Sequence, residues 1–286
     1  MSHVGLPLKN VRHRTSTRFS QQQAIAMTVF SVFNMSGGVG KTTLTMNLSY
    51  ELNTRGVKTL AVDMDPQASL TTFFGLDAYE LSETIHNCLM DSAPLPVEPS
   101  DWCDLAPANL TLAQAELSLT AELRREYRLA DALSKVSDQY DAIIVDGPPS
   151  LGLLSVNCLV AADYLIVPLA TNYKAVEATM GLLRVSIEIA SKVNPGLKVL
   201  GLVPTMFDRR TSGSRRAKDA IYDIAAQLQL PMFEGMQVFD PIPLRTAISD
   251  AQEAHQPLSV YDSKNDGLKA IRKIADVMAS RVKVSV

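Results

Sequence analysis

The chain has 286 residues and a net charge of −3, with 47% hydrophobic and 20% charged residues. These values are ordinary for a globular protein with a sizeable core, and they exclude a strongly basic protein that would bind nucleic acid over its whole surface. No apolar run approaches the roughly 20 residues that span a bilayer. Cys88, Cys103 and Cys158 lack metal-ligand spacing, which indicates a reduced, cytoplasmic compartment without a disulfide framework.

The first 26 residues differ from the rest in charge. Residues 1–26 contain no acidic side chain and four basic ones, Lys9, Arg12, Arg14 and Arg18. They lack the apolar segment of a signal peptide, so we expect a flexible basic N-terminal arm. Two interpretations stay open: an unstructured extension before an inner start at Met27, or an arm that touches an anionic surface.

A strand, a glycine-rich loop and a helix are predicted next. Residues 27–33 form a short apolar, β-branched and aromatic run, and leucines recur at positions 44, 48 and 52, one face of a helix. Between them, glycines allow a polyphosphate to approach the backbone, whose N–H groups and helix N-terminus would face the anion. The predicted phosphate-binding residues are Gly37, Gly38, Val39, Gly40, Lys41, Thr42 and Thr43.

Acidic side chains follow two further predicted strands. Residues 58–63 end in Asp63, with Asp65 in the next turn, and residues 140–146 end in Asp146. Open α/β sheets bind ligands at the carboxyl ends of their strands, and carboxylates there can bind Mg²⁺. Asp146 alone could instead cap a helix, but the phosphate loop on the same chain favours a nucleotide site.

The remaining elements alternate between strand and helix, which predicts an α/β fold with a mainly parallel sheet and helices on both faces. We expect strands at 164–169 and 198–203, a loop at 91–104, an apolar stretch at 236–239, and helices at 68–76, 109–133, 175–192, 214–228 and 267–283.

The motifs together resemble the ParA/MinD family of ATPases, P-loop NTPases with a deviant Walker A loop, over one domain at 27–286. They appear in family order: 37–43, 62–67, 146–154, 167–169 and 205–208. The resemblance implies ATP and Mg²⁺ as cofactors, with Lys41 and Thr42 binding phosphate and metal. It also implies that Asp65 positions the attacking water, that Asp146 is the Walker B carboxylate with Asp63 supporting the metal, and that the base pocket includes Asp208, Pro241 and Pro243.

One departure from the family concerns its signature lysine, because Ser36 occupies that position. In the family this lysine reaches across an ATP-bound homodimer to the partner's nucleotide. Lys174, expected in a loop after a strand, is the candidate substitute, although an ordinary exposed lysine is the alternative. A serine at this position also resembles the carboxysome-positioning McdA subgroup.

Two groups of cations could contact DNA without base readout: Arg209, Arg215, Arg216, Lys218, Lys269, Arg272 and Lys273. Such clusters are also common on ordinary solvated faces. A membrane track is disfavoured because residues 267–283 contain no aromatic anchor.

The sequence therefore predicts a cytoplasmic, nucleoid-associated ATPase that dimerises on ATP, binds non-specific DNA and positions a cargo. A cargo-bound adaptor, McdB-like or ParB-like, would stimulate hydrolysis. The cargo could be a carboxysome, a plasmid or a chromosome region. A small-molecule metabolic ATPase and a regulatory binder without turnover stay open as alternatives.

Overall fold

The computed structural model describes residues 27–282. Its centre is a seven-stranded sheet of order β3-β2-β4-β1-β5-β6-β7, in which every pair of neighbouring strands is parallel. The strands are β1 (Thr28–Val32), β2 (Thr59–Asp63), β3 (Asp104–Ala106), β4 (Ala142–Asp146), β5 (Tyr164–Ala170), β6 (Lys198–Thr205) and β7 (Gln237–Val238). The predicted basic arm lies outside the described residues, and a single domain over 27–286 stays a prediction.

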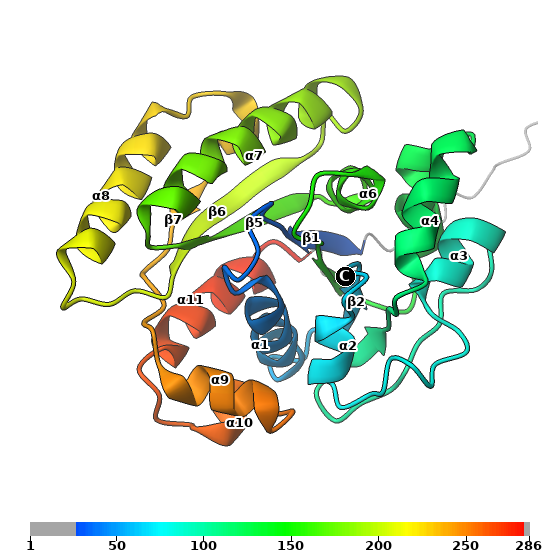
Figure 1. Ribbon diagram of the computed structural model, residues 1–286, viewed down its shortest axis with the longest axis horizontal. Helices are drawn as coiled ribbons and strands as arrows, with labels where there is room; N and C mark the ends of the chain where they lie inside the picture. Colours follow the sequence, from blue (N-terminus) through cyan, green and yellow to red (C-terminus); the bar gives the residue numbers. More distant parts are fainter. Residues whose placement is uncertain (1–26, 283–286) are drawn as a thin grey trace, which may run out of the picture.

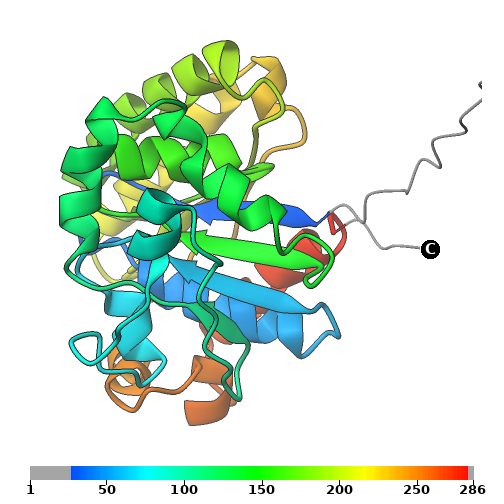
Figure 2. The ribbon, with the colours of Figure 1, turned by 90° about the vertical axis from the view of Figure 1, so that its right-hand side faces the viewer.

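Helices cover both faces of the sheet, as predicted (Figures 1 and 2). One face carries α1 (Lys41–Asn53), α2 (Ser69–Phe73), α9 (Thr246–Glu253), α10 (Leu258–Tyr261) and α11 (Leu268–Ala279). The other carries α3 (Ile85–Asp91), α4 (Leu112–Ser118), α5 (Arg128–Ser134), α6 (Leu153–Ala161), α7 (Tyr173–Lys192) and α8 (Ser212–Gln227). None of the helices within residues 27–282 is long and apolar enough to cross a bilayer.

The alternation of side chains along the central strands explains the two layers. In β4, Ile144 faces α1 and α11, whereas Ile143 and Val145 face the opposite layer. Both sets are fully buried, as expected for a parallel strand with helices on each side. The predicted leucine stripe of α1 packs with apolar residues of α11, so the helix after the glycine loop is held firmly against the sheet.

The strand register places the predicted acidic residues side by side. Asp63, the last residue of β2, is paired with Asp146, the last residue of β4, and Val32 of β1 is paired with Asp146 on the other side. Three strands therefore end at the same level, where the glycine-rich loop leaves β1. This edge of the sheet holds the candidate site.

The segment predicted as one helix over 109–133 is broken. It consists of α4, two short 3-10 turns (η1, Leu119–Ala121, and η2, Arg125–Tyr127) and α5. The break is stabilised from outside the segment, because the buried Asn157 side chain accepts from the Leu129 N–H at 3.0 Å and donates to the Arg125 carbonyl at 2.9 Å. Helical periodicity alone does not reveal such a long-range contact.

Other elements were not predicted. The segment 91–104, predicted as a loop, runs into the three-residue strand β3 at the sheet edge, and α3, α6, α9 and α10 were missed. These elements are short or wholly apolar, so they lack the clear periodicity that identifies a helix or strand. Lys174 is the second residue of α7 rather than a loop residue.

Candidate nucleotide site

The glycine-rich loop joins β1 to α1 with two residues in left-handed conformation. Gly38 has φ +67° and Gly40 has φ +87°, a region that favours glycine. Gly40 precedes the first residue of α1, so the backbone N–H groups of the loop and the first turn gather at one helix N-terminus. That arrangement suits a polyanion.

Asn34 holds the loop in place, a role that the sequence reasoning missed. Its buried amide donates to the Pro168 carbonyl of β5 at 2.8 Å, and its Oδ1 accepts from the Ser36 N–H at 2.9 Å. The Lys41 ammonium donates to the Ser36 carbonyl at 3.1 Å. The loop is therefore fastened to the sheet before any ligand arrives.

Thr42 and Asp146 meet as predicted for a metal site. The Thr42 hydroxyl donates to Asp146 Oδ2 at 2.7 Å, and the Thr45 hydroxyl lies 3.3 Å from Asp146 Oδ1. Asp146 is fully buried. A hydroxyl and a carboxylate at the N-terminus of α1 provide two hard oxygen ligands of the kind that Mg²⁺ prefers.

Asp63 and Asp65 have different surroundings. Both oxygens of the buried Asp63 accept hydrogen bonds, Oδ1 from the Asp65 N–H at 3.1 Å and Oδ2 from the N–H and hydroxyl of Thr71 at 2.8 Å each. Asp63 thus orders the turn that carries Asp65, and its role as a metal ligand stays a prediction. Asp65 lines the site, with Oδ1 accepting from the Gln67 N–H at 2.9 Å.

Burial is the main influence on the pKa values of the acidic side chains. Burial raises the pKa of Asp146 to about 8, with the neighbouring Asp63 charge adding to the rise. Burial also raises the pKa of Asp63 to about 6, and it raises the pKa of Asp65. Burial lowers the pKa of Lys41 despite the opposing charges of Asp146 and Asp65. A site so short of positive charge favours a bound cation.

Lys41, Thr42 and Asp65 line a pocket of about 350 Å³ at the carboxyl edge of the sheet, whereas Asp63 and Asp146 are fully buried. The phosphate end is formed by Gly37, Gly38, Gly40, Lys41, Thr42, Thr43 and Asp65. Val39 lies beneath this end, where its carbonyl accepts from the buried Thr205 hydroxyl at 2.8 Å. The loop is thereby joined to the end of β6 as well as to β5.

The opposite end of the pocket is largely apolar; the sequence predicted the segment 240–243 there but not the residues that follow it, from Leu244 to Gln252. Ile242, Leu244 and Ile248 form its walls, and Gln252 of α9 lies with its Oε1 3.4 Å from the Thr43 hydroxyl. An apolar slot next to a phosphate loop fits a flat base. Only the prolines near 241–243 signalled this region in the sequence.

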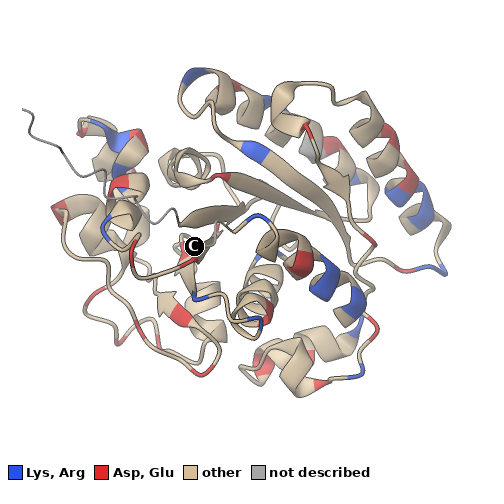
Figure 3. Ribbon diagram, turned by 180° about the vertical axis from the view of Figure 1, so that it is seen from behind, with Lys and Arg blue, Asp and Glu red and all other residues tan. Residues whose placement is uncertain are grey.

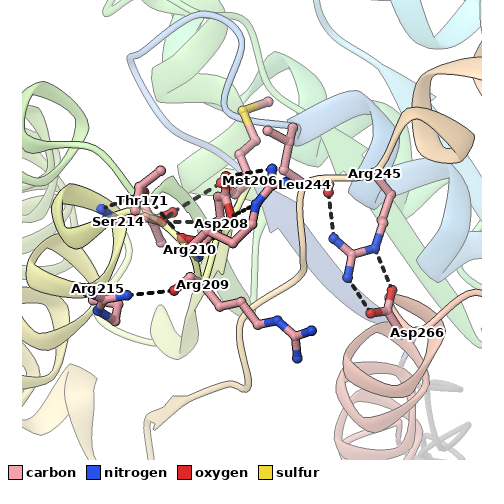
Figure 4. A network of polar contacts seen from close by, with 11 residues as sticks. Thr171, Met206, Asp208, Arg209, Arg210, Ser214, Arg215, Leu244, Arg245 and Asp266 are labelled. Carbon is pink, nitrogen blue, oxygen red and sulfur yellow. Dashed lines mark hydrogen bonds and ion pairs between the residues drawn. The ribbon is translucent and has the colours of Figure 1, made fainter.

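Of the three residues predicted to line the base pocket, only one lines it in the described structure. Pro243 lines the pocket, whereas Asp208 and Pro241 line an adjoining cavity of about 390 Å³. Asp208 pairs there with Arg210 at 3.0 Å, and the Arg245 guanidinium forms two hydrogen bonds with Asp266 (Figure 4). A contact of Asp208 or Pro241 with a nucleotide stays a prediction.

Lys174 does not line this pocket. It is exposed at the start of α7, and Ser36 is half-buried in the glycine loop. The catalytic role of Lys174 therefore stays a prediction.

The predicted DNA-binding cations lie on α8, on the loop before it and on α11. Figure 3 shows acidic residues beside the basic ones on both helices. Several cations are partly neutralised: Lys218 lies 3.3 Å from Asp219, Arg272 lies 3.3 Å from Glu51, and Lys273 lies 3.5 Å from Asp240. Arg209, Arg215, Arg216 and Lys269 are exposed without a carboxylate partner among residues 27–282.

The donor set fits a magnesium ion that is shared with a phosphate ligand rather than held by protein alone. Among the described residues, no group of three or more His, Cys, Asp or Glu could hold a metal by itself. Mg²⁺ typically uses one or two protein oxygens and completes its coordination with phosphate and water. Thr42 and Asp146 supply such a pair.

Comparisons with known proteins agree with this geometry. A family model described as an AAA domain matches residues 27–199. The chain is 34% identical over 261 residues to the chromosome partitioning protein ParA of Caulobacter vibrioides, covering 88% of this chain and 94% of that protein. Its fold matches cobyrinic acid a,c-diamide synthase from Mycobacterium smegmatis, solved with ADP and magnesium (TM-score 0.74, 35% identity, 87% and 93% coverage). It also matches apo McdA from Cyanothece (TM-score 0.76, 25% identity, 87% and 99% coverage).

The raised pKa of Asp146 predicts a pH-dependent stability of the metal-free chain. The folded state keeps the Asp146 proton up to a pKa of about 8, whereas the unfolded chain releases it near 3.8. As the pH rises from 4 to 8, the free energy of unfolding of the wild type should therefore fall relative to that of Asp146→Asn, by up to about 1.4 kcal/mol per pH unit. Urea unfolding in EDTA without nucleotide measures this difference. Asp138→Asn, at an exposed position, is the matched control, and a difference that is constant with pH would contradict the assignment.

Proposed function

Because this chain belongs to the ParA/MinD family, we propose that it is a Mg²⁺-dependent ATPase that partitions or positions a cargo. The observation that carries the proposal is the meeting of Lys41, Thr42 and Asp146 at the end of a glycine-lined pocket. A cation, a hydroxyl and a buried carboxylate at a helix N-terminus suit a polyphosphate with its metal.

The protein residues divide the work of the site. Lys41 and the loop N–H groups would bind the β- and γ-phosphates, while Thr42 and Asp146 would hold the metal. Bound Mg²⁺ would neutralise the charge that develops on the transferred phosphoryl group. Asp63 supports the turn that carries Asp65 through its bonds to Thr71 and the Asp65 N–H.

Asp65 is the proposed water-positioning residue. One oxygen is held by the Gln67 N–H, and no donor within residues 27–282 is assigned to Oδ2, which leaves that oxygen to accept from a water in the pocket. The side chain is only 8% exposed, so its orientation is well restricted. Orienting the nucleophile is a main contribution of protein groups to phosphoryl transfer.

We propose that ATP binding forms a homodimer in which Lys174 replaces the signature lysine that is absent at Ser36. The exposed position of Lys174 at the start of α7, a helix that directly follows a strand end at the nucleotide edge of the sheet, leaves its ammonium available to a second chain. The competing interpretation is a solvated lysine with no role.

The proposed track is non-specific DNA in the nucleoid, within the cytoplasm. The free cations before and on α8, and Lys269 on α11, could each pair with a phosphate. The proposal includes a ParB-like or McdB-like adaptor on the cargo that stimulates hydrolysis.

Two cargo classes have support. The 34% identity to a chromosome partitioning protein favours a chromosome or plasmid region. Ser36 and the likeness to McdA favour a carboxysome. The 35% identity to cobyrinic acid a,c-diamide synthase keeps a metabolic enzyme as a further candidate, which would turn over rapidly with a small substrate and without an activator protein.

Removing the Asp65 carboxylate should separate binding from turnover. We expect Asp65→Asn to reduce ATP hydrolysis by roughly 10²-fold or more while nucleotide affinity stays within a few-fold, because only the water loses its acceptor. Phosphate release and a fluorescent-nucleotide titration measure the two quantities. Asp101→Asn, at an exposed position outside the pocket, is the control. Equal turnover of Asp65→Asn and wild type would disprove the role.

Lys174 can be tested through the oligomeric state. Wild type should be a dimer with ATP and a monomer with ADP or no nucleotide, whereas Lys174→Ala should stay monomeric with ATP. Ser36→Lys in the Lys174→Ala background should restore the dimer if the two lysines are equivalent. Light scattering after size exclusion is the measurement, and Lys192→Ala at the other end of α7 is the control. Full dimerisation and turnover of Lys174→Ala would remove the proposal.

DNA binding should require ATP and fall steeply with salt. The logarithm of the DNA-binding constant falls linearly with the logarithm of the salt concentration, and each lost phosphate contact makes this slope shallower by about one. We therefore expect the double variant Arg209→Gln, Arg216→Gln to have a slope that is shallower by about two. Fluorescence anisotropy on a duplex of arbitrary sequence measures it. Lys198→Gln, at the amino end of β6, should change nothing. Binding that is insensitive to salt would argue against the electrostatic account.

A further inference from the structure

A second concave site lies between the end of α3 and α5. It encloses about 220 Å³ and shares no lining residue with the nucleotide pocket. Three cations line it, Arg124, Arg128 and Lys135, together with one carboxylate, Asp131. Positions 128, 131 and 135 lie on one face of the helix, so these charges converge by helical spacing.

Arg128 has a donor that no described residue satisfies. Its side chain is 18% exposed, and its terminal nitrogen donates to Glu122 at 2.8 Å. Its Nε, however, is buried without a hydrogen-bond partner among residues 27–282. A buried guanidinium N–H without an acceptor is costly, so an anion that enters the pocket and draws the Arg128 guanidinium toward it would supply the missing acceptor.

The other two cations are available to such an acceptor. Lys135 donates to the Ser92 carbonyl at 3.1 Å and has no carboxylate partner within the described part of the chain. Arg124 pairs with Asp131 at 3.0 Å, but both side chains are more than half exposed, and exposed pairs of this kind are weak. An anion can therefore displace Asp131 from Arg124 at little cost.

We propose that this α3–α5 pocket binds the phosphate group of a small phosphorylated ligand. Two guanidinium groups offer the forked donors that match phosphate oxygens, and Lys135 adds a point charge. The enclosed volume suits a small molecule rather than a polymer backbone. The site is separate from ATP hydrolysis and from the cations assigned to DNA.

The test uses the full chain with its nucleotide pocket filled by a non-hydrolysable ATP analogue and Mg²⁺, so that the glycine loop does not bind the probe. Titration calorimetry with inorganic phosphate and with phenyl phosphate should show one saturable site. The double variant Arg124→Gln, Lys135→Gln should bind at least tenfold more weakly. Arg128→Lys, which keeps the charge but removes Nε, should also bind several-fold more weakly.

The matched control is Arg184→Gln with Lys192→Gln, which removes one exposed arginine and one exposed lysine from α7 and should leave phosphate binding unchanged. Circular dichroism verifies that each variant is folded. The proposal is overturned if wild type shows no saturable binding, if the Arg124/Lys135 variant binds like wild type, or if acetate binds as tightly as phosphate. Loss of DNA binding with unchanged phosphate binding in that variant would also overturn it, because the cluster would then belong to the DNA surface.

Discussion

The site depends on two carboxylates that the sheet forces together. Asp63 and Asp146 end neighbouring parallel strands in register, and both are fully buried. Water does not screen their mutual repulsion, because neither side chain is exposed. Hydroxyl donors from Thr42, Thr45 and Thr71 and the ammonium of Lys41 offset part of this cost. The remaining need for positive charge makes a metal with its polyphosphate the natural ligand.

The glycine loop is the second constraint, because it brings donors to those carboxylates. Asn34 and Thr205 fix the loop to β5 and β6, so its N–H groups are oriented before binding and little ordering entropy is lost. In the last turn of α1, the buried Glu51 accepts from Arg55 at 2.6 Å and from Arg272 of α11 at 3.3 Å. The helix is therefore held at both ends.

The class of fold and the location of the site were predictable, because apolar strands, leucine spacing and carboxylates at strand ends are all local patterns. The structure confirms the parallel α/β sheet with helices on both faces. The contribution of α9, the anchoring by Asn34 and the break stabilised by Asn157 were not predictable, since each depends on a partner distant in sequence. The sequence showed the cations of α11 but not their partners. Arg272 was predicted to be free for DNA binding, but in the structure it pairs with Glu51 of α1.

The hydroxyl of Thr205 has a consequence for how the two halves of the sheet communicate. It donates to Val39, while the Thr205 carbonyl accepts from the N–H of Thr171, whose own hydroxyl lies 2.6 Å from that of Ser214 at the first turn of α8. Ser214 in turn accepts from the Asp208 N–H at 3.1 Å. The glycine loop and the turn before α8 are therefore connected by one continuous series of hydrogen bonds through three small hydroxyl side chains, Thr205, Thr171 and Ser214.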